Sequence, residues 1–474
     1  MIHSLRERMT EGVQQIMRTQ MDLKQKKVLV VGTGISGIAA AELLASNGIS
    51  FEVYDGNKKL SESDIRAKAE VFSDCAVMTG TLPQEACPRY SYAVLSPGVP
   101  TDLPEIEALR AQGVKIWGEI ELAYAFSRGD VLAITGTNGK TTTTTLVGEI
   151  MKSFAEDVKV VGNIGIPYTS MAEETTEQTV TVAELSSFQL ETVECFAPKI
   201  SAILNITPDH LNRHHTMEAY IAAKERITQG QAPGEVCVLN YEDAVLRAFG
   251  ESIKERLRVV WFSSMRRLDG GLYLEDGKIY DATGNGTRLV CEVDSLNLLG
   301  RHNYENVMAA AAIALCYGVP LEKIQKVLAK FTAVAHRIEY VAEVGGVKYY
   351  NDSKGTNPDA AIQGIRAMNR KTCLIGGGYD KQSGYEAWIE AFDGKVKKLV
   401  LIGETAGKIA KTCDRLGFAD YVFAGSLKEA VDICHEVAES GDAVLLSPAC
   451  ASWDMFKSYE ERGDLFKEIV RGLA

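Results

Sequence analysis

The order of apolar and polar residues predicts strands that alternate with helices along most of the chain. Near the start, the apolar runs at 26–32 and 49–55 have the length of buried strands, and the Ala- and Leu-rich segment 35–48 between them is typical of a helix. Strand, helix and strand in this order form a βαβ unit with parallel strands. A further strand is expected at 92–95, and the pattern places the end of this region near Glu119.

Two further regions continue the alternation. In residues 120–332, the segment 130–154 has the order strand, glycine-bearing loop, helix. The other elements expected there are strands at 179–185, 200–206 and 235–240, a helix over 215–229, a β-rich stretch over 258–293 and an Ala-rich helix over 301–317. In residues 333–474, strands are expected at 347–352, 372–378, 397–403 and 442–449, with helical segments between them. Such alternation predicts a parallel sheet, so we expect an α/β protein with three domains, at 1–119, 120–332 and 333–474.

The composition is that of a soluble globular protein, with 46% hydrophobic and 24% charged residues among 474. The formal net charge of −12 argues against a nucleic-acid-binding protein, because neutralising phosphates needs a basic surface. The 10 cysteines include no C-x-x-C pair, so we expect reduced thiols and no cysteine-based metal site. No apolar run reaches about 20 residues and the N-terminus lacks the apolar part of a signal peptide, so we expect a cytoplasmic protein without membrane contact.

A glycine-rich turn follows the first predicted strand. Gly32, Gly34 and Gly37 stand in the order G-T-G-I-S-G at the start of the predicted helix, and Asp55 ends the next strand. Such glycines let the backbone approach a phosphate, and the acidic residue can accept a hydrogen bond from a sugar or a base. We interpret the turn as a Rossmann-like nucleotide site. The motif alone does not separate NAD from another nucleotide, and a tight turn that binds nothing is the alternative.

A second loop has the residues of a triphosphate site. Between an apolar strand and a helix it contains Gly136, Thr137, Asn138, Gly139, Lys140, Thr141 and Thr142. Its N–H groups can surround phosphates, Lys140 can neutralise their charge, and the Thr141 hydroxyl can bind magnesium. The loop is shorter than the standard G-x-x-x-x-G-K-[ST] form, since Ile134 stands at the position of the first glycine.

Three residues that come later in the chain than this loop are candidates to act with it. Glu184 ends a predicted strand and offers the hard oxygen ligands that suit magnesium. His210 follows the next strand and could bind a metal or an acyl phosphate, and Lys224 lies on the helix after it. The alternative for each residue is an ordinary solvated side chain, and the spacing alone does not decide between them.

Further polar residues stand later in the chain. They are Asn303, Asn306, Arg337, Asp352, Lys381 and Ser452. The asparagines can read an adenine edge, the arginine can hold a phosphate and the aspartate can hold a ribose hydroxyl. The lysine and the serine follow predicted strands, at the sheet edge where open α/β sheets bind ligands. Each residue by itself would more commonly be a helix cap or a surface group.

Taken in order from about residue 27 to residue 466, the motifs resemble those of the Mur ligase family. They are GTGISG, SPGVP, TGTNGKTT, GNIGIP, ELSSFQLE, NITPDHLNRH, AAKERI, GRHNYENV, HR, NDSKGTNP, GGGYDK and LLSPACASWDMF. The loop TGTNGKTT is similar to that of folylpolyglutamate synthases as well, whereas ELSSFQLE and SPACASWDMF resemble the branch of the family that adds D-glutamate. The DNPR-type signature of the branch that adds a diamino acid is absent from the sequence.

The resemblance implies both function and fold. It implies an ATP-dependent amide ligase of peptidoglycan precursor synthesis, which adds D-glutamate to UDP-N-acetylmuramoyl-L-alanine through an acyl phosphate. The implied cofactors are ATP and two magnesium ions. The first domain would bind the UDP of the substrate rather than NAD, the central domain would be a P-loop ATPase domain, and the C-terminal ligase domain would hold the amino acid. We expect a monomer without nucleic-acid or membrane partners.

The resemblance also implies roles for individual residues. The substrate site would comprise Gly34, Ile35, Ser36 and Asp55 near the uridine, Ser96 and Gly98 near the diphosphate, and Asn163 and His210 at the muramoyl part. The ATP site would comprise residues 136–142 with Asn303, Asn306, Arg337 and Asp352. The metal ligands would be Thr141 and Glu184 for one ion, and His210 and a carbamate on Lys224 for the other. The catalytic residues would be Lys140, His210 and Lys224. D-Glutamate would lie at Thr356, Lys381, Ser452 and Tyr459, and the family often has Phe at this last position.

Three other interpretations remain open at this point. A NAD-dependent oxidoreductase would explain GTGISG but would leave TGTNGKTT and ELSSFQLE unused. A binding protein gated by ATP would hydrolyse the nucleotide without needing an amino acid. A folylpolyglutamate synthase-like or other Mur-type ligase would share the ATP loop, and the former would lack a UDP-binding first domain.

Overall fold

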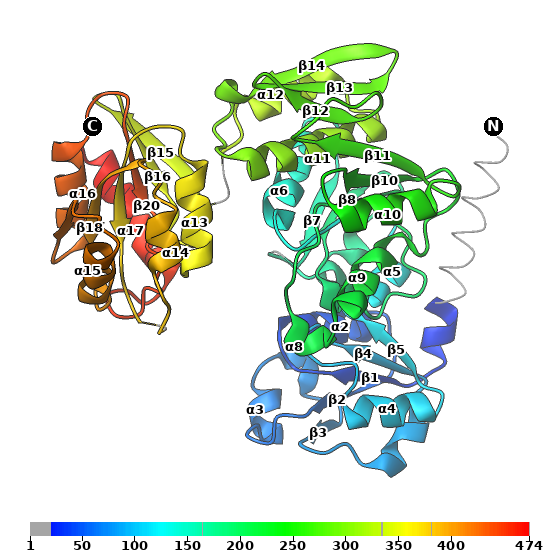
Figure 1. Cartoon of the computed structure of the whole chain (residues 1–474). Coiled ribbons are helices and arrows are strands. Elements are labelled where there is room, and N and C mark those ends of the chain that lie inside the picture. Colours follow the sequence, from blue (N-terminus) through cyan, green and yellow to red (C-terminus); the bar gives the residue numbers. More distant parts are fainter. Residues whose placement is uncertain (1–19, 164, 333–334, 381, 474) are drawn as a thin grey trace. The chain divides into compact units, whose positions relative to one another are not determined.

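The computed structural model describes residues 20–163, 165–332, 335–380 and 382–473. The chain divides into two compact units (Figure 1). The first unit comprises Met1–Tyr273, Tyr280–Arg288 and Met308–Ile324, and the second comprises Leu274–Ile279, Leu289–Val307 and Gln325–Ala474. Of the polar segment that precedes the first predicted strand, only residues 20–25 are among the described residues.

The first unit begins with a five-stranded parallel sheet in the order β3-β2-β1-β4-β5. Its strands are β1 (Val28–Val31), β2 (Phe51–Asp55), β3 (Val77–Thr79), β4 (Tyr92–Leu95) and β5 (Lys115–Gly118). The helices are α2 (Ile35–Ser46), α3 (Glu62–Arg66), α4 (Pro104–Ala111) and α5 (Glu119–Phe126). The predicted βαβ unit is confirmed as β1–α2–β2, and β4 is the strand predicted at 92–95.

This sheet is buried on both faces, as alternate residues of β1 illustrate. Leu29 and Val31 belong to one hydrophobic core, whereas Val28 and Val30 belong to a second core on the opposite face. The second core includes side chains of α2 and α5 and continues to Leu239 in the central sheet. The five-stranded sheet and the central sheet are therefore joined by continuous apolar packing.

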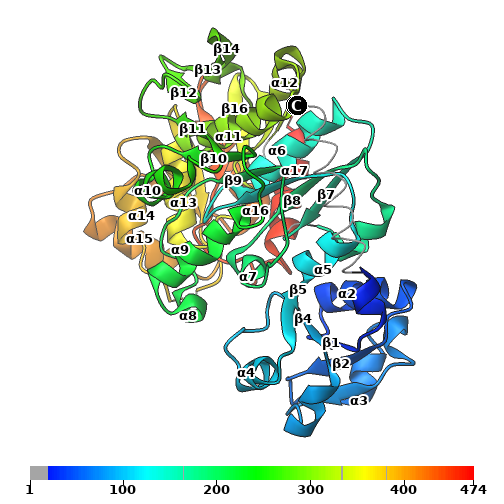
Figure 2. The same cartoon turned by 90° about the vertical axis from the view of Figure 1, so that its right-hand side faces the viewer.

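The central sheet has nine strands in the order β14-β13-β12-β11-β10-β9-β6-β8-β7. The strands are β6 (Asp130–Thr135), β7 (Val158–Gly162), β8 (Val180–Glu184), β9 (Ile200–Ile203), β10 (Val236–Asn240), β11 (Arg258–Ser263), β12 (Leu272–Glu275), β13 (Lys278–Gly284) and β14 (Gly286–Glu292). The helices are α6 (Lys140–Lys152), α7 (Ser187–Leu190), α8 (Leu211–His214), α9 (Met217–Glu225), α10 (Ala244–Ile253), α11 (Arg301–Tyr317) and α12 (Leu321–Leu328). Helix α6 packs on β6, β7 and β8 (Figure 2).

Two elements of this region differ from the prediction in extent. The helix predicted over 215–229 begins at Met217, because the Thr216 side chain accepts a hydrogen bond from the Ala219 N–H and caps the helix. It ends at Glu225 and is followed by a short 3₁₀ turn. The β-rich stretch does not interrupt the sheet: β11 pairs in parallel with β10, and β12 to β14 extend the same sheet.

The second unit contains a six-stranded sheet in the order β15-β16-β20-β17-β18-β19. Its strands are β15 (Glu339–Val344), β16 (Val347–Asn351), β17 (Thr372–Gly376), β18 (Val396–Leu401), β19 (Tyr421–Phe423) and β20 (Ala443–Leu446). Its helices are α13 (Pro358–Ala367), α14 (Glu386–Glu390), α15 (Ala406–Arg415), α16 (Leu427–Val437) and α17 (Tyr459–Arg471). The predicted parallel sheet is confirmed from β16 to β19, whereas the unpredicted edge strand β15 is antiparallel to β16.

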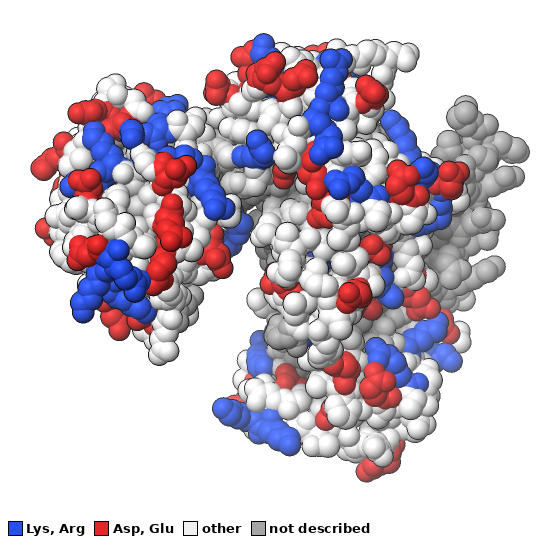
Figure 3. All heavy atoms as spheres, viewed as in Figure 1, with Lys and Arg blue, Asp and Glu red and all other residues white. Residues whose placement is uncertain are grey.

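The surface carries charges of both signs. Acidic and basic side chains are interspersed over the face shown in Figure 3. Within the described ranges of the chain, no helix has both the length and the apolar character needed to cross a membrane.

Candidate functional site

The predicted triphosphate loop leaves the carboxyl end of β6 and leads into α6. Gly139 directly precedes the helix with φ +83°, a left-handed conformation that glycine adopts without strain. Asn205, which follows β9, holds the loop: its carbonyl accepts the Thr137 N–H at 2.9 Å, and its Oδ1 accepts the Asn138 N–H at 2.8 Å. The loop is thus fixed at a helix N-terminus, an arrangement that favours phosphate.

Two lysines meet at the first residue of this loop. The Lys140 Nζ donates to the carbonyl oxygens of Gly136 and Thr137, each at 2.9 Å. The Lys224 Nζ, which comes from α9, donates to the same Gly136 oxygen at 2.7 Å. Lys224 is only 1% exposed. Its burial and the repulsion of Lys140 lower the pKa of Lys224 to about 7, so this amine is partly neutral at physiological pH.

Glu184 is buried at the same sheet edge with one oxygen unpaired. It ends β8 and is the register partner of Ile134 in β6. Its Oε1 accepts a hydrogen bond from the Asn163 Nδ2 at 2.8 Å, while its Oε2 has no hydrogen-bond partner in the described part of the chain. A buried carboxylate oxygen without a partner is costly and is a typical ligand for a hard cation. Together with the Thr141 hydroxyl in the first turn of α6, this donor set fits magnesium.

His210 lies on the loop after β9. It is the N-cap of α8 with φ +52°, and its half-exposed ring lies 4.8 Å from the ring of Phe188, centroid to centroid. Its Nε2 is 3.4 Å from Asp209 Oδ2. Within the described residues no hydrogen bond joins His210 to Lys224. Each of these two expected metal ligands is therefore held by other contacts.

The residues expected to bind the UDP-containing substrate come together in one pocket of about 560 Å³ in the first unit. Its lining includes Gly34, Ile35, Ser36, Asp55, Ser96, Gly98 and Asn163. The Ile35 side chain is 76% exposed at the start of α2, where the backbone N–H groups of the first turn have no side-chain cap. Gly37 allows the turn to be tight, since a Cβ atom there would lie 2.0 Å from the Gly32 oxygen. The pocket thus offers backbone donors to an anion.

Asp55 holds the wall of this pocket. Its Oδ2 accepts hydrogen bonds from the Thr33 N–H at 3.1 Å and the Thr33 hydroxyl at 2.5 Å, and its Oδ1 accepts the Asn57 N–H at 3.0 Å. Burial acts to raise the pKa of Asp55, but these hydrogen bonds outweigh it and lower the pKa. The carboxylate is therefore ionised, and much of its acceptor capacity is used by its own chain.

The remaining candidates lie in the second unit. Asn303 and Asn306 are buried on α11, where the Asn303 Nδ2 donates to the Leu299 carbonyl at 2.8 Å. Asp352 follows β16, and its carboxylate accepts the Ser447 hydroxyl at 2.7 Å and the Ile338 N–H at 3.2 Å. Burial raises the pKa of Asp352 to about 7. These residues belong to the second unit, whereas the triphosphate loop belongs to the first.

The expected amino-acid site also lies in this unit. Ser452 is buried on the loop after β20, and Tyr459 is the first residue of α17. The loop after β16 carries Asp352, Lys354 and Thr356. The Lys354 Nζ lies 5.6 Å from the centre of the Tyr459 ring. Lys381 lies outside the described residues. The described members of the set therefore come from loops at the carboxyl ends of β16 and β20, where open α/β sheets bind ligands.

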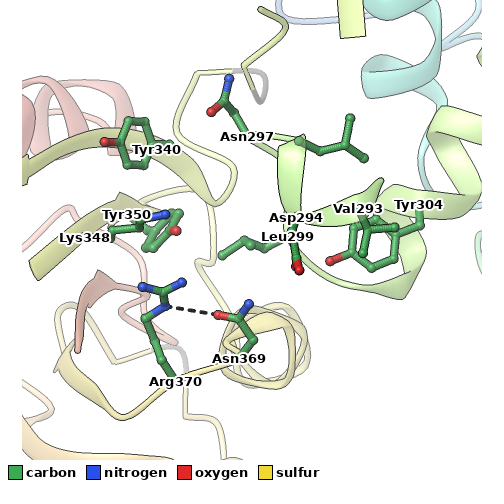
Figure 4. Close-up of a pocket in the computed structure, with 11 residues that line it drawn as sticks. Val293, Asp294, Asn297, Leu299, Tyr304, Tyr340, Lys348, Tyr350, Asn369 and Arg370 are labelled. Carbon is green, nitrogen blue, oxygen red and sulfur yellow. Dashed lines mark hydrogen bonds between the residues drawn. The ribbon is translucent and has the colours of Figure 1, made fainter. Parts of the chain in front are cut away.

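A separate pocket of about 400 Å³ contains none of the predicted residues. Figure 4 shows Tyr340, Lys348 and Tyr350 from β15 and β16 on one side of it, and Val293, Asp294 and Tyr304 on the other. The Arg370 Nε donates to the Asn369 Oδ1 at 3.1 Å at its edge. Tyr304 is its one lining residue that belongs to a predicted motif, GRHNYENV, and no site residue is predicted there.

Comparison with known proteins covers nearly the whole chain. The family model described as "Mur ligase MurD-like, N-terminal domain" matches residues 26–118, "Mur ligase middle domain" matches 134–314, and "Mur ligase, glutamate ligase domain" matches 336–450. Two relatives carry the name UDP-N-acetylmuramoylalanine--D-glutamate ligase. The protein of Lachnoclostridium phytofermentans is 55% identical over 96% of this chain and 99% of its own length, and that of Lachnospira eligens is 52% identical over 96% and 100%.

Solved structures share the fold at low identity. A UDP-N-acetylmuramate-alanine ligase from Thermotoga maritima has a TM-score of 0.57 at 21% identity, over 95% of this chain and 100% of that chain. A pseudomurein peptide ligase type C from Methanothermus fervidus has a TM-score of 0.53 at 17% identity, with the same coverage. The motifs, the arrangement of the sheets and the matched families agree, and the chain belongs to the Mur ligase family.

Proposed function

We propose that the protein is the ATP-dependent ligase that joins D-glutamate to UDP-N-acetylmuramoyl-L-alanine in peptidoglycan precursor synthesis. The names of relatives at 55% and 52% identity support this substrate pair. The observation that carries the proposal is the triphosphate loop, on which Lys140 and Lys224 converge, in the unit that also contains the pocket of about 560 Å³. A phosphate-transfer centre and a site of nucleotide-sugar size within one unit are what this reaction requires.

The pocket supports a role in binding the UDP-sugar. Gly34, Ile35 and Ser36 would contact the uridine together with Asp55, whose hydrogen bonds to Thr33 keep this wall in place. Ser96 and Gly98 would contact the diphosphate, through backbone and hydroxyl donors that favour an anion. Asn163 and His210 would contact the muramoyl part. Asn163 lines the pocket and also donates to Glu184, so it would connect the substrate to the phosphate-transfer centre.

ATP would occupy the loop Gly136–Thr142. The N–H groups of Thr137 and Asn138 are engaged by Asn205, so phosphate binding would rely on the other N–H groups at the start of α6 and on Lys140. Asn303, Asn306, Arg337 and Asp352 of the second unit would complete the nucleotide site. In this arrangement Lys140 would offset the charge that develops on the γ-phosphate.

Two magnesium ions fit the available ligands. Thr141 and the unpaired oxygen of Glu184 would hold one, and His210 and a carbamate on Lys224 would hold the other. The pKa of about 7 supports the carbamate, because only the neutral amine adds to carbon dioxide, releasing a proton and leaving a carboxylate-like ligand. Bound magnesium would supply charge neutralisation for the phosphates.

The chemistry would proceed in two steps. The carboxylate of the substrate attacks the γ-phosphorus of ATP, so that an acyl phosphate forms and ADP leaves. The free amine of D-glutamate then attacks the acyl carbon, forming the amide and releasing phosphate. Thr356, Lys381, Ser452 and Tyr459 would hold D-glutamate, with hydroxyl groups and an ammonium group as partners for its carboxylates.

The test is ATP-dependent phosphate release with magnesium and UDP-N-acetylmuramoyl-L-alanine, comparing D-glutamate, L-glutamate and meso-diaminopimelate. We expect turnover with D-glutamate and little with the other two. Turnover with meso-diaminopimelate alone would assign another branch of the family, and phosphate release that needs no amino acid would contradict ligase chemistry.

A further inference from the structure

A buried arginine contacts the loops on which the proposed amino-acid site stands. Arg462 lies in the first turn of α17 and is only 1% exposed. Its Nε donates to the Ser353 hydroxyl at 2.9 Å, and its Nη2 donates to the Ser353 carbonyl oxygen at 2.8 Å. Ser353 lies directly after Asp352 on the loop that leads to Thr356. The guanidinium therefore holds the loop that follows β16.

The same guanidinium also holds the loop that follows β20. Its Nη2 and Nη1 donate to the Cys450 carbonyl oxygen at 3.2 and 3.3 Å, and Nη1 also donates to that of Ala451 at 3.4 Å. Ser452 comes next in the chain. The Ala451 oxygen also accepts the Tyr379 N–H at 2.9 Å. This hydrogen bond joins the loop after β20 to the loop after β17, on which Tyr379 lies. One side chain thus connects, directly or through Ala451, three loops at one sheet edge.

The helix that carries Arg462 is joined to the same loops. The Ser353 hydroxyl donates to the Tyr459 carbonyl oxygen at 2.8 Å, which fixes the backbone at the start of α17, where Tyr459 stands. Ser353 is itself fully buried. The position of Tyr459 therefore depends on the same buried contacts that set the positions of the two loops.

The charge of Arg462 has no paired carboxylate. Its five hydrogen bonds go to a hydroxyl or to carbonyl oxygens, and it forms no ion pair with any residue that the structure describes. The charges of Asp454 and Asp352 act on it without a hydrogen bond. Burial lowers the pKa of Arg462 to about 10, so the group remains charged at neutral pH. Burying an unpaired charge is costly, and the five hydrogen bonds recover only part of that cost. A positive charge kept at this edge favours an anionic ligand beside it.

We infer that Arg462 is the positioning residue of the amino-acid site: it holds the loops of Thr356, Tyr379 and Ser452 in place relative to one another, and its charge, which has no hydrogen-bonded carboxylate, favours an amino acid with two carboxylates. This inference rests on the proposed function, since it takes D-glutamate as the ligand of these loops. It predicts that Arg462 acts most strongly on the affinity for the amino acid, less on that for ATP, for which Asp352 on the same loop is proposed as a ligand, and not on that for the UDP-sugar, whose pocket lies in the first unit.

The test compares R462K and S353A with the wild type in the phosphate-release assay. R462K keeps the charge but loses the planar fork of donors, and S353A removes one acceptor of that fork. We expect R462K to raise the KM for D-glutamate at least about tenfold and S353A to raise it about threefold or more, because hydrogen bonds to charged groups are lost. The KM for UDP-N-acetylmuramoyl-L-alanine should stay within about twofold. The KM for ATP should rise less than that for D-glutamate, because only Asp352 of the proposed ATP ligands stands on the perturbed loop. The control is R471K, an exposed arginine in the last turn of the same helix, which should leave all three KM values unchanged.

A merely structural role would lower the amount of active enzyme and the melting temperature but leave the KM for D-glutamate unchanged, and that outcome would overturn the inference. Equal increases in all three KM values would overturn it as well. If R462K does not fold, S353A decides the question by the same criteria. A wild-type protein without D-glutamate-dependent phosphate release would instead refute the proposed function, so the two failures are distinguishable.

Discussion

Replacing Lys224 by Met is expected to make the protein more stable while destroying its activity. The folded environment lowers the pKa of Lys224 from 10.5 to about 7. At 1.36 kcal/mol per pKa unit, this corresponds to a destabilisation of roughly 5 kcal/mol when the amine is charged in both states. Local relaxation around a buried charge reduces the effect, so we expect K224M to gain about 2–4 kcal/mol near pH 6.5. The substitution leaves no unpaired acceptor, because the Gly136 oxygen still accepts from Lys140.

The pH dependence distinguishes this explanation from simple apolar packing. Below pH 7, Lys224 is protonated in the folded and the unfolded chain, and the full penalty applies. Between pH 7 and pH 10.5 the unfolded chain holds a proton that the folded chain lacks, so the wild type becomes more stable as the pH rises. The advantage of K224M should therefore shrink by about 1.4 kcal/mol per pH unit above pH 7 and vanish between about pH 8.5 and pH 10.

The assay is denaturant unfolding of both proteins from pH 6 to pH 10 in carbon-dioxide-free buffer, with K254M, at an exposed lysine, as the control. Added bicarbonate should stabilise the wild type, through the carbamate, and leave K224M unchanged. A variant less stable than the wild type at pH 6.5, or an advantage that does not depend on pH, would refute the reasoning.

Three further substitutions test other parts of the site. D55A removes the acceptor of the Thr33 and Asn57 hydrogen bonds and should raise the KM for the UDP-sugar at least about tenfold, with that for ATP nearly unchanged; equal effects on both would contradict the assignment. K140A should abolish ATP-dependent phosphate release without lowering the melting temperature, and retained turnover would exclude its role. The Glu121 carboxylate accepts three consecutive backbone N–H groups, those of Glu194, Cys195 and Phe196. E121Q weakens this acceptor and should cost about 1–3 kcal/mol of unfolding free energy with unchanged KM values. An unaltered denaturation midpoint would show that the contact contributes little.

Most of the elements near the site follow from local sequence patterns. The strand–loop–helix order around Gly136–Thr142 needs only an apolar run, glycines with the required backbone conformation and a helix-forming segment, and all three are contiguous in the chain. The same holds for β1–α2–β2. Strand β15 escaped prediction because its residues are only partly buried at a sheet edge, so they lack the continuous apolar run that marks a central strand. The four-residue helix α8 is too short to show a helical period.

The sequence by itself determined the order of the elements, the phosphate-binding turns and the kinds of residue available for chemistry, because backbone conformation and periodicity are properties of neighbouring residues. Only the tertiary structure decided that Lys140 and Lys224 share one carbonyl oxygen, that Asn205 holds the triphosphate loop and that Arg462 connects separate loops without a carboxylate partner. These contacts join residues far apart in the chain. They arise because the order of strands in each sheet brings particular carboxyl ends together, and no local period encodes that order.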